Sequence, residues 1–155
     1  MLKCMIIDDG SSAPALEHHI CKVPFLRLTK TYHNPMDALF NLNAAPVDLI
    51  FLDIPKQQLN AVQFLKLLEN RTQVIITSDN EENAVVGFEH DVTDYLPKPI
   101  SFERFFKGVE KVRKIKKLTE RVDNARETQP LTVGYIFEKF ETKIIRVELD
   151  DILFV

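Results

Sequence analysis

Short apolar segments alternate along the chain with segments in which apolar side chains recur every three or four positions. The first kind predicts five β-strands, over Cys4–Ile7, Leu26–Tyr32, Leu49–Leu52, Val74–Thr77 and Asp94–Leu96. The second kind predicts helices that begin near Ala13, cover Pro35–Ala44, Ala61–Glu69 and Glu82–Phe88, and run from Phe102 to about residue 120. Strands that alternate with helices across short loops are typical of right-handed βαβ crossovers. We therefore predict an α/β fold with an open, five-stranded, parallel, doubly wound sheet.

The pattern changes after residue 120. Residues 121–130 are polar and end in Thr-Gln-Pro, which predicts a linker or a frayed helix end. Two alternating segments, Ile136–Phe140 and Ile144–Leu149, then predict a short β-hairpin, and Ile152–Val155 begins a third strand. So few strand residues cannot bury a core of their own. We therefore expect an α/β domain over residues 1–120, a linker over 121–130 and the incomplete beginning of a β domain over 131–155.

Composition narrows the class of protein. The chain has 155 residues, of which 45% are hydrophobic and 28% charged, enough apolar side chains for a packed core. Its apolar runs are far shorter than the ~20 residues of a membrane span. Two cysteines are too few for a disulfide framework, so we expect a protein of the reducing cytoplasm with no membrane partner.

Charge is unevenly distributed. Residues 101–121 contain eight basic and three acidic side chains within a chain whose net charge is −3. Their helical spacing favours a solvated helix face over a nucleic-acid surface, since no aromatic side chains that could stack on bases interrupt the basic ones. Acidic residues of the preceding helix region, Glu81, Glu82, Glu89 and Asp91, offer a complementary charge. A homodimer that pairs the two patches is therefore expected.

Polar side chains follow four of the predicted strands. Asp8 and Asp9 come after the first strand, Asp53 after the third, Ser78 after the fourth and Lys98 after the fifth. Ligands bind open parallel sheets beyond the carboxyl ends of the strands, where these groups should meet. Three carboxylates in one crevice suit Mg²⁺, and a carboxylate left partly free can attack phosphorus. A lysine and a hydroxyl can then bond the oxygens of a transferred phosphoryl group.

The segments that carry these residues resemble the receiver domains of bacterial two-component response regulators. The matching segments are Ile6–Asp9, Asp48–Ile54 and Asp94–Ile100. Ala84–Phe88 and Ser101–Phe105 are similar to receivers of LytTR-type regulators, and Val147–Val155 is similar to the opening of the LytTR DNA-binding domain. The resemblance implies a flavodoxin-like receiver over residues 1–120, followed by an N-terminal fragment of that output domain. Such a fragment is not expected to bind DNA, which needs the complete domain.

The resemblance also implies a chemical role for the residues at the strand ends. Asp53 would accept a phosphoryl group from a sensor histidine kinase, with Mg²⁺ held by Asp8, Asp9, Asp53 and the backbone carbonyl of Pro55. Lys98 would bond the phosphoryl group. Such a receiver catalyses only its own phosphorylation and is not an enzyme with a separate substrate.

Two further residues carry the response to phosphorylation in the family. By resemblance, the Ser78 hydroxyl moves toward the phosphoryl group, and the Tyr95 ring turns inward with it. The surface formed by the fourth helix, the fifth strand and the fifth helix changes as a result, and dimerisation through that surface is common.

Several positions depart from the family pattern. Lys56-Gln57 and Ala61 replace a Met-Pro pair and a glycine, Gly10 replaces an acidic residue, and Asp79 stands where a small residue is usual. These departures leave open a degenerate receiver that binds partners without phosphorylation. An aspartyl-phosphate phosphatase is a third reading, but that class places Asp-x-Asp after its first strand, whereas here the nucleophile follows the third.

Overall fold

The computed structural model describes residues 1–54, 59–68 and 72–128. Within them, five strands alternate with five helices in the predicted order. These elements are β1 (Leu2–Ile7), α1 (Ala13–Cys21), β2 (Leu26–Tyr32), α2 (Pro35–Leu42), β3 (Leu49–Asp53), α3 (Leu59–Leu67), β4 (Gln73–Ser78), α4 (Asn83–Glu89), β5 (Asp94–Pro97) and α5 (Phe102–Thr128).

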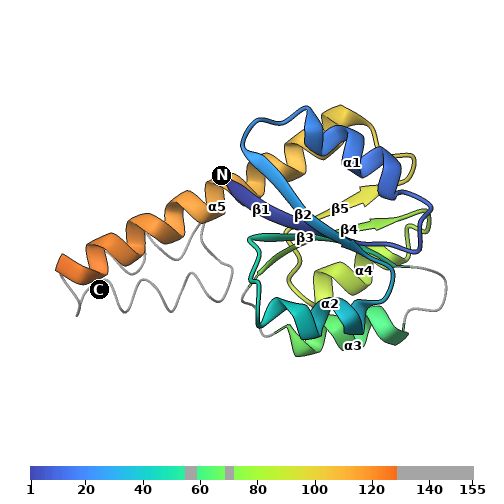
Figure 1. Cartoon of the computed structure of the whole chain (residues 1–155), viewed down its shortest axis with the longest axis horizontal. Coiled ribbons are helices and arrows are strands. Elements are labelled where there is room, and N and C mark those ends of the chain that lie inside the picture. The colour runs from blue at the N-terminus through green and yellow to red at the C-terminus, as the bar shows by residue number, and fades with distance from the viewer. Residues whose placement is uncertain (55–58, 69–71, 129–155) are drawn as a thin grey trace. The chain divides into compact units, whose positions relative to one another are not determined.

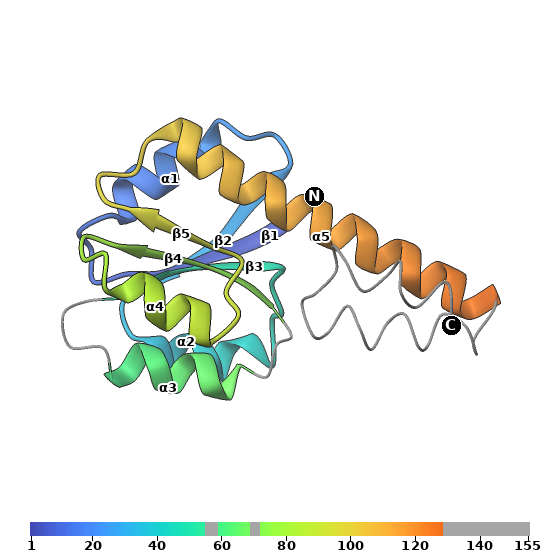
Figure 2. The ribbon, with the colours of Figure 1, turned by 180° about the vertical axis from the view of Figure 1, so that it is seen from behind.

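The five strands form one sheet in the order β2-β1-β3-β4-β5, and every neighbouring pair is parallel. The chain first builds outward from β1 to β2, then crosses to β3 and continues to β5 on the other side. Helices cover both faces of the sheet: α1 and the start of α5 lie on one face, and α2, α3 and α4 lie on the other (Figures 1 and 2). The predicted doubly wound parallel sheet is confirmed.

The side chains of β3 pack into two separate hydrophobic cores, one on each face of the sheet. Strand β3 is buried along its whole length, and its residues alternate between the faces of the sheet. Phe51 points to the α1/α5 face, where its ring stacks on Phe105 with centroids 5.4 Å apart. Ile50 belongs to the cluster on the other face, with Phe64 of α3. The continuous apolar run of β3 follows from this burial on both faces.

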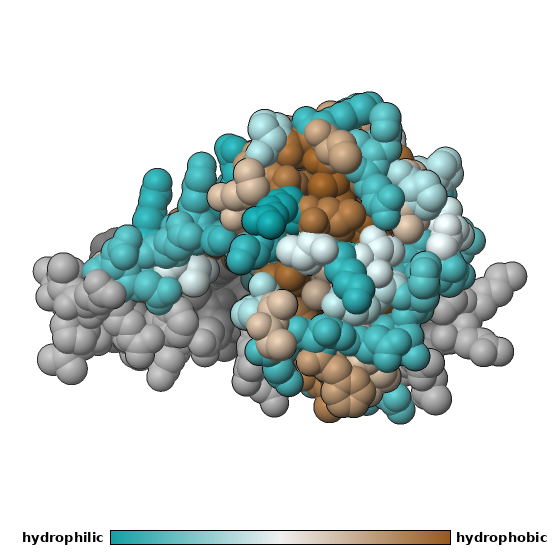
Figure 3. Space-filling view, in the orientation of Figure 1, coloured by the Kyte–Doolittle hydropathy of each residue, from teal (hydrophilic) through white to brown (hydrophobic). Residues whose placement is uncertain are grey.

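Some apolar surface stays in contact with water. In the view of Figure 3, apolar surface gathers in the region of α1 and β2. Phe25 and Leu28 are only partly buried against the core cluster that contains Phe51 and Phe105. Phe40 of α2 and Leu67 of α3 are exposed on the opposite layer. Charged and polar surface surrounds these areas in the same view.

Helix α5 is longer than predicted. It continues past residue 120 to Thr128, through most of the segment that the sequence indicated as a linker. Residues 119–128 contain neither glycine nor proline, and their arginine, glutamate and alanine residues favour helix, so nothing ends the helix near residue 120.

Residues Met1–Val112 form one compact unit, and the helix continues into a second unit, Arg113–Val155. The predicted hairpin tail lies outside the described residues. Among the helices that the structure describes, none is both long and apolar enough to cross a membrane.

Candidate functional site

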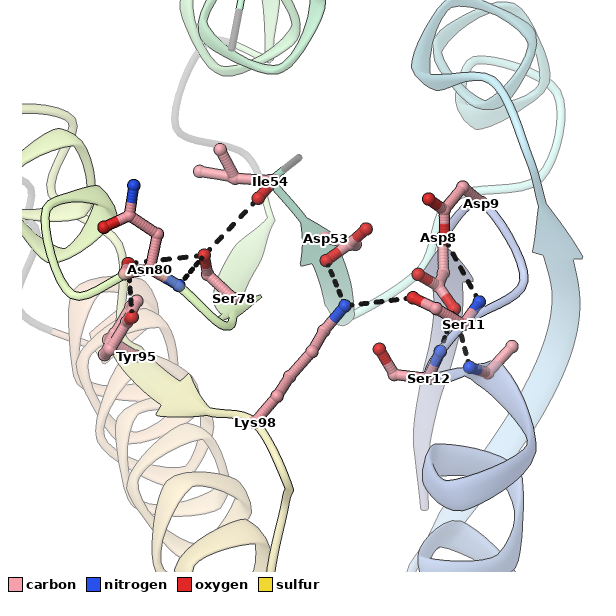
Figure 4. Close-up of polar contacts among 11 residues, drawn as sticks. Asp8, Asp9, Ser11, Ser12, Asp53, Ile54, Ser78, Asn80, Tyr95 and Lys98 are labelled. Atoms are coloured by element: carbon pink, nitrogen blue, oxygen red, sulfur yellow. Dashed lines mark hydrogen bonds and ion pairs between the residues drawn. The ribbon is translucent and has the colours of Figure 1, made fainter. Parts of the chain in front are cut away.

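The strand ends bring the predicted polar residues together at one edge of the sheet. Asp8 follows β1, Asp53 ends β3, Ser78 ends β4 and Lys98 follows β5. Because all five strands are parallel, their carboxyl ends share an edge, and β1 and β3 are direct neighbours there. Figure 4 shows the side chains of Asp53 and Lys98 pointing toward each other from adjacent parts of this edge, with Asp8 beside them.

Three carboxylates form an acidic cluster. One oxygen from each of Asp8, Asp9 and Asp53 lies within 4.8 Å of the others. Asp8 is buried, and its Oδ2 accepts hydrogen bonds from the backbone N–H groups of Ser12 and Ala13, at 2.8 and 2.6 Å. These two groups belong to the start of α1, whose dipole also favours a negative charge. Helix α1 therefore holds the Asp8 carboxylate in place.

Asp9 is exposed and is held by its own loop. The backbone N–H of Ser11 donates to Asp9 Oδ1 at 3.1 Å, and this bond is the main reason that the pKa of Asp9 lies below its ordinary value. The loop turns back through Gly10, whose φ of +113° is a conformation that residues with a side chain rarely adopt. The departure at Gly10 thus has a structural reason, because this φ favours glycine there.

The cluster fits a hard divalent cation. Within the described part of the chain, Asp8 Oδ1 is buried and has no hydrogen-bond partner, which is costly for a carboxylate oxygen. A cation among the three carboxylates would satisfy this oxygen. An all-oxygen set with one exposed member, able to leave room for water ligands, is chemically suited to Mg²⁺.

Asp53 sits in a setting that raises its pKa. The side chain is 5% exposed, and Lys98 Nζ lies 2.7 Å from its Oδ1. Burial raises the pKa of Asp53 to about 6, and the Asp8 charge adds to the rise, while the Lys98 ammonium opposes it. A carboxylate that is partly desolvated yet paired with a lysine can be ionised at neutral pH and remain reactive.

Ser78 and Tyr95 meet at the loop that follows β4. Ser78 is fully buried; its Oγ lies 3.4 Å from the Ile54 carbonyl and accepts from the Asn80 N–H at 3.0 Å. The Tyr95 hydroxyl donates to the Asn80 carbonyl at 2.7 Å, and partial burial raises the pKa of Tyr95. The two side chains that sequence resemblance linked are therefore connected through the backbone of Asn80 (Figure 4).

Other predicted positions have different outcomes. Pro55 and Lys56-Gln57 lie outside the described residues, so the carbonyl assigned to the metal stays a prediction. The Asp79 side chain, one of the departures from the family pattern, is exposed, so water screens its charge.

Sequence reasoning missed two partners within the site. It assigned neither Ser11 nor Asn80 to the site. Ser11 Oγ accepts a hydrogen bond from Lys98 Nζ at 3.1 Å. Asn80 acts through backbone atoms, which no side-chain motif can signal. For Ser11 the signal was present in the neighbouring glycine, since a glycine between Asp9 and Ser11 predicts a tight turn.

The fold and the site together define a flavodoxin-like α/β protein with an acidic site at the carboxyl edge of its sheet. Within that class, the chain belongs to the response regulator receiver domain family, whose model matches residues 4–110.

Curated relatives support this assignment. The chain is 28% identical over 115 residues to an uncharacterized response regulatory protein of Vibrio cholerae, covering 72% of this chain and 48% of that protein. It is 26% identical to the sensory transduction protein LytT of Bacillus cereus, covering 100% of this chain and 65% of LytT. It is 31% identical to the transcriptional regulatory protein DcuR of Shigella flexneri, and the match covers 68% of this chain and 47% of DcuR. The chain thus spans about half to two thirds of the length of these relatives.

Solved structures agree on the fold. The response regulatory domain of mrkE from Klebsiella pneumoniae superposes with a TM-score of 0.65 at 25% identity, covering 73% of this chain and 96% of that domain. The response regulator domain of CheB from Thermotoga maritima gives a TM-score of 0.61 at 23% identity, and the match covers 74% of this chain and 95% of that domain. The sequence-based assignment to a receiver with LytT-like relatives is confirmed.

Proposed function

We propose that Asp53 accepts a phosphoryl group from a phosphohistidine of a sensor histidine kinase. An Asp53 carboxylate oxygen forms the new bond to phosphorus, and the bond between phosphorus and the imidazole nitrogen of the kinase breaks, leaving its electron pair on that nitrogen. The observation that carries the proposal is the buried Asp53 paired with Lys98 at 2.7 Å beside two further carboxylates. Receiver domains are the partners of histidine kinases in two-component systems, which gives the donor.

The neighbouring residues have separate tasks in this proposal. Asp8, Asp9 and Asp53, with the Pro55 carbonyl, would hold Mg²⁺, which offsets the negative charge of the phosphoryl oxygens when bound. The Lys98 ammonium has three N–H donors, of which, among the described residues, Asp53 and Ser11 take two. The third is available to a phosphoryl oxygen, so Lys98 can stabilise the transferred group.

Ser78 and Tyr95 would report the phosphorylation to the surface. The Ser78 Oγ lies 3.4 Å from the Ile54 carbonyl and 3.3 Å from the Asn80 carbonyl, and a phosphoryl oxygen is a stronger acceptor than either carbonyl. Movement of Ser78 away from Asn80 would disturb the loop that holds the Tyr95 hydroxyl. We infer that the α4-β5-α5 surface changes in this way and controls a LytTR-type DNA-binding output.

The free thiols Cys4 and Cys21 fit the expected cytoplasmic setting.

A homodimer through the same surface fits the charges. Exposed acidic side chains border α4, at Glu81, Glu82, Glu89 and Asp91, and the exposed ammonium groups of Lys107 and Lys111 lie on α5. Opposite patches on two copies can pair across a two-fold axis. Sedimentation should therefore show association on phosphorylation that weakens as salt is raised, and a monomer at every concentration would contradict this proposal.

The phosphoacceptor role is tested by direct labelling. The 155-residue chain is incubated with acetyl phosphate and Mg²⁺, and its intact mass is measured over time. One phosphoryl group per chain is expected, and chelation of the cation by EDTA should prevent its uptake, because the acidic cluster then lacks its counter-charge. No uptake at saturating donor and Mg²⁺ would favour the degenerate receiver that works by binding alone.

A further inference from the structure

The backbone of the segment that carries Lys98 is fixed at two points. The Lys98 N–H donates to the Ser78 carbonyl at 2.9 Å, which extends the β4–β5 pairing by one residue. His19 Nε2 lies 2.8 Å from the Ile100 carbonyl, and since a carbonyl only accepts, the ring nitrogen donates. The remaining freedom lies in the side chain of Lys98, whose four-carbon stem has many rotamers in solution.

The end of that side chain is held by a residue outside the predicted set. Lys98 Nζ donates to Ser11 Oγ at 3.1 Å and pairs with Asp53 Oδ1 at 2.7 Å, so the ammonium lies between the β1–α1 loop and strand β3. Figure 4 shows Ser11 and Asp53 approaching the ammonium from different directions. An ammonium with one partner can swing around it, whereas two acceptors in different directions fix its position.

The loop conformation allows Ser11 to reach the ammonium. Gly10 has a φ of +113°, and the Ser11 N–H is tied back to Asp9 Oδ1 at 3.1 Å. No atom lies within 4 Å of a Cβ placed on Gly10, so space does not demand glycine here, but the backbone conformation does. The sequence Asp9-Gly10-Ser11 is thus suited to presenting a hydroxyl beside the acidic cluster.

We propose that Ser11 is a positioning residue that fixes the Lys98 ammonium for phosphoryl transfer to Asp53. Ser11 acts through Lys98 and is not itself a nucleophile. When Lys98 is held by Ser11 as well as Asp53, its third N–H keeps a defined direction during the reaction. The kinetic consequence rests on the function proposed above, but the fixed ammonium is a property of the protein before any reaction.

The first test observes the ammonium directly, without phosphorylation. In the ¹⁵N-labelled 155-residue chain, the Lys98 side-chain resonance is assigned by its absence from Lys98→Gln. We expect a resolved, slowly exchanging ammonium signal in wild type and severalfold faster exchange with water in Ser11→Ala. Ser11→Thr keeps the hydroxyl and should restore slow exchange, because Ser11 is exposed and has room for a methyl group. Equal exchange in wild type and Ser11→Ala would overturn the proposal.

The second test measures the rate of phosphorylation by acetyl phosphate. Loss of one charge-assisted hydrogen bond corresponds to roughly a threefold to tenfold slower maximum rate in Ser11→Ala. The Mg²⁺ concentration for half-maximal rate should stay the same, and Ser11→Thr should recover the wild-type rate. A higher Mg²⁺ requirement with unchanged ammonium exchange would mean that Ser11 acts on the acidic loop, which contradicts the proposal.

The two tests fail independently. If wild type takes up no phosphoryl group, the proposed function fails, and the ammonium exchange alone decides the role of Ser11. Gly10→Ala provides a second variant, because a strained loop should withdraw the hydroxyl and reproduce the fast exchange of Ser11→Ala while the hydroxyl itself is still present. Slow exchange in Gly10→Ala would contradict the role given to Gly10.

Discussion

Replacing Asp53 by Asn is expected to abolish phosphoryl uptake, with a loss of about a thousandfold or more because the amide is a far weaker nucleophile than the carboxylate. The amide keeps the shape of the side chain, so the buried end of β3 should stay folded. Uptake is measured by intact mass after incubation with acetyl phosphate and Mg²⁺. Asp48→Asn is the matched control, because Asp48 precedes the same strand at the opposite edge of the sheet and bonds the Lys3 N–H. Equal uptake by Asp53→Asn would contradict the assignment.

The same variant should be more stable than wild type at neutral pH in the absence of a divalent cation. Burial raises the pKa of Asp53 to about 6, so the folded protein binds this proton more tightly than the unfolded chain does. The contribution of Asp53 to stability is therefore full below about pH 4 and is lost as the pH rises through about 6. Asn does not ionise, so Asp53→Asn removes this loss of stability at neutral pH.

The size of the gain follows from the shift. Two pKa units correspond to about 2.7 kcal/mol, and since the variant also deprives Lys98 of its partner, we expect a net gain of about 1–2 kcal/mol at pH 7.5. Urea denaturation at pH 7.5 and at pH 4.5 checks this difference, which should shrink at the lower pH. A variant that is less stable than wild type at pH 7.5 would show that the ion pair with Lys98 outweighs the burial of the carboxylate.

Much of the fold was predictable because the strand pattern is strong. The Leu-Ile-Phe-Leu run that ends at Asp53 reads as a strand buried on both faces, and both neighbouring layers confirm it. The convergence of Asp8, Asp53, Ser78 and Lys98 follows from parallel strands alone, since each residue stands at a carboxyl end. Local pattern and strand direction were therefore sufficient to find this edge of the sheet.

The individual contacts within the site could not be predicted from the sequence as readily. The bond from Lys98 to Ser11 joins residues 87 positions apart and depends on a backbone turn at Gly10. The backbone carbonyl of Asn80 accepts a hydrogen bond from the Tyr95 hydroxyl, and because every residue has such a carbonyl, the sequence gives no sign of this contact. The end of α5 was also misjudged, because a polar, charged segment is equally compatible with a linker and with a solvated helix.

The last prediction concerns an ion pair that joins β5 to α5. Arg104 donates from Nη1 to Asp94 Oδ2 and from Nη2 to Asp94 Oδ1, both at 2.6 Å, and Nη2 also reaches the Tyr95 carbonyl at 3.0 Å. The Asp94 side chain is 7% exposed. Burial alone would raise the pKa of Asp94, but Arg104, the Tyr95 N–H and Lys111 together hold it below its ordinary value. The pair therefore fixes the backbone next to Tyr95 from the side of α5.

Arg104→Gln is expected to lower the free energy of unfolding by about 2–3 kcal/mol, because it leaves a buried carboxylate with only Lys111 and a backbone N–H. Arg104→Lys keeps the charge but loses the two-pronged geometry, so about 1 kcal/mol is expected. The effect of Arg104→Gln should shrink as the pH falls toward 4, since a carboxyl group with a depressed pKa stabilises the fold only where the unfolded chain is also ionised.

A neighbouring lysine on α5 supplies the control. Lys107 pairs with Glu103 at 3.4 Å, but both side chains are exposed, so Lys107→Gln should cost less than about 0.5 kcal/mol. Urea denaturation of the three variants at pH 7.5 measures the difference between a bidentate pair with a buried carboxylate and a pair on the same helix whose side chains are both exposed. If Arg104→Gln costs no more than Lys107→Gln, water or Lys111 satisfies Asp94 equally well. In that case Arg104 does not fix β5, and Tyr95 is positioned by the β4–β5 pairing, by its N–H on Asp94 and by its hydroxyl on Asn80.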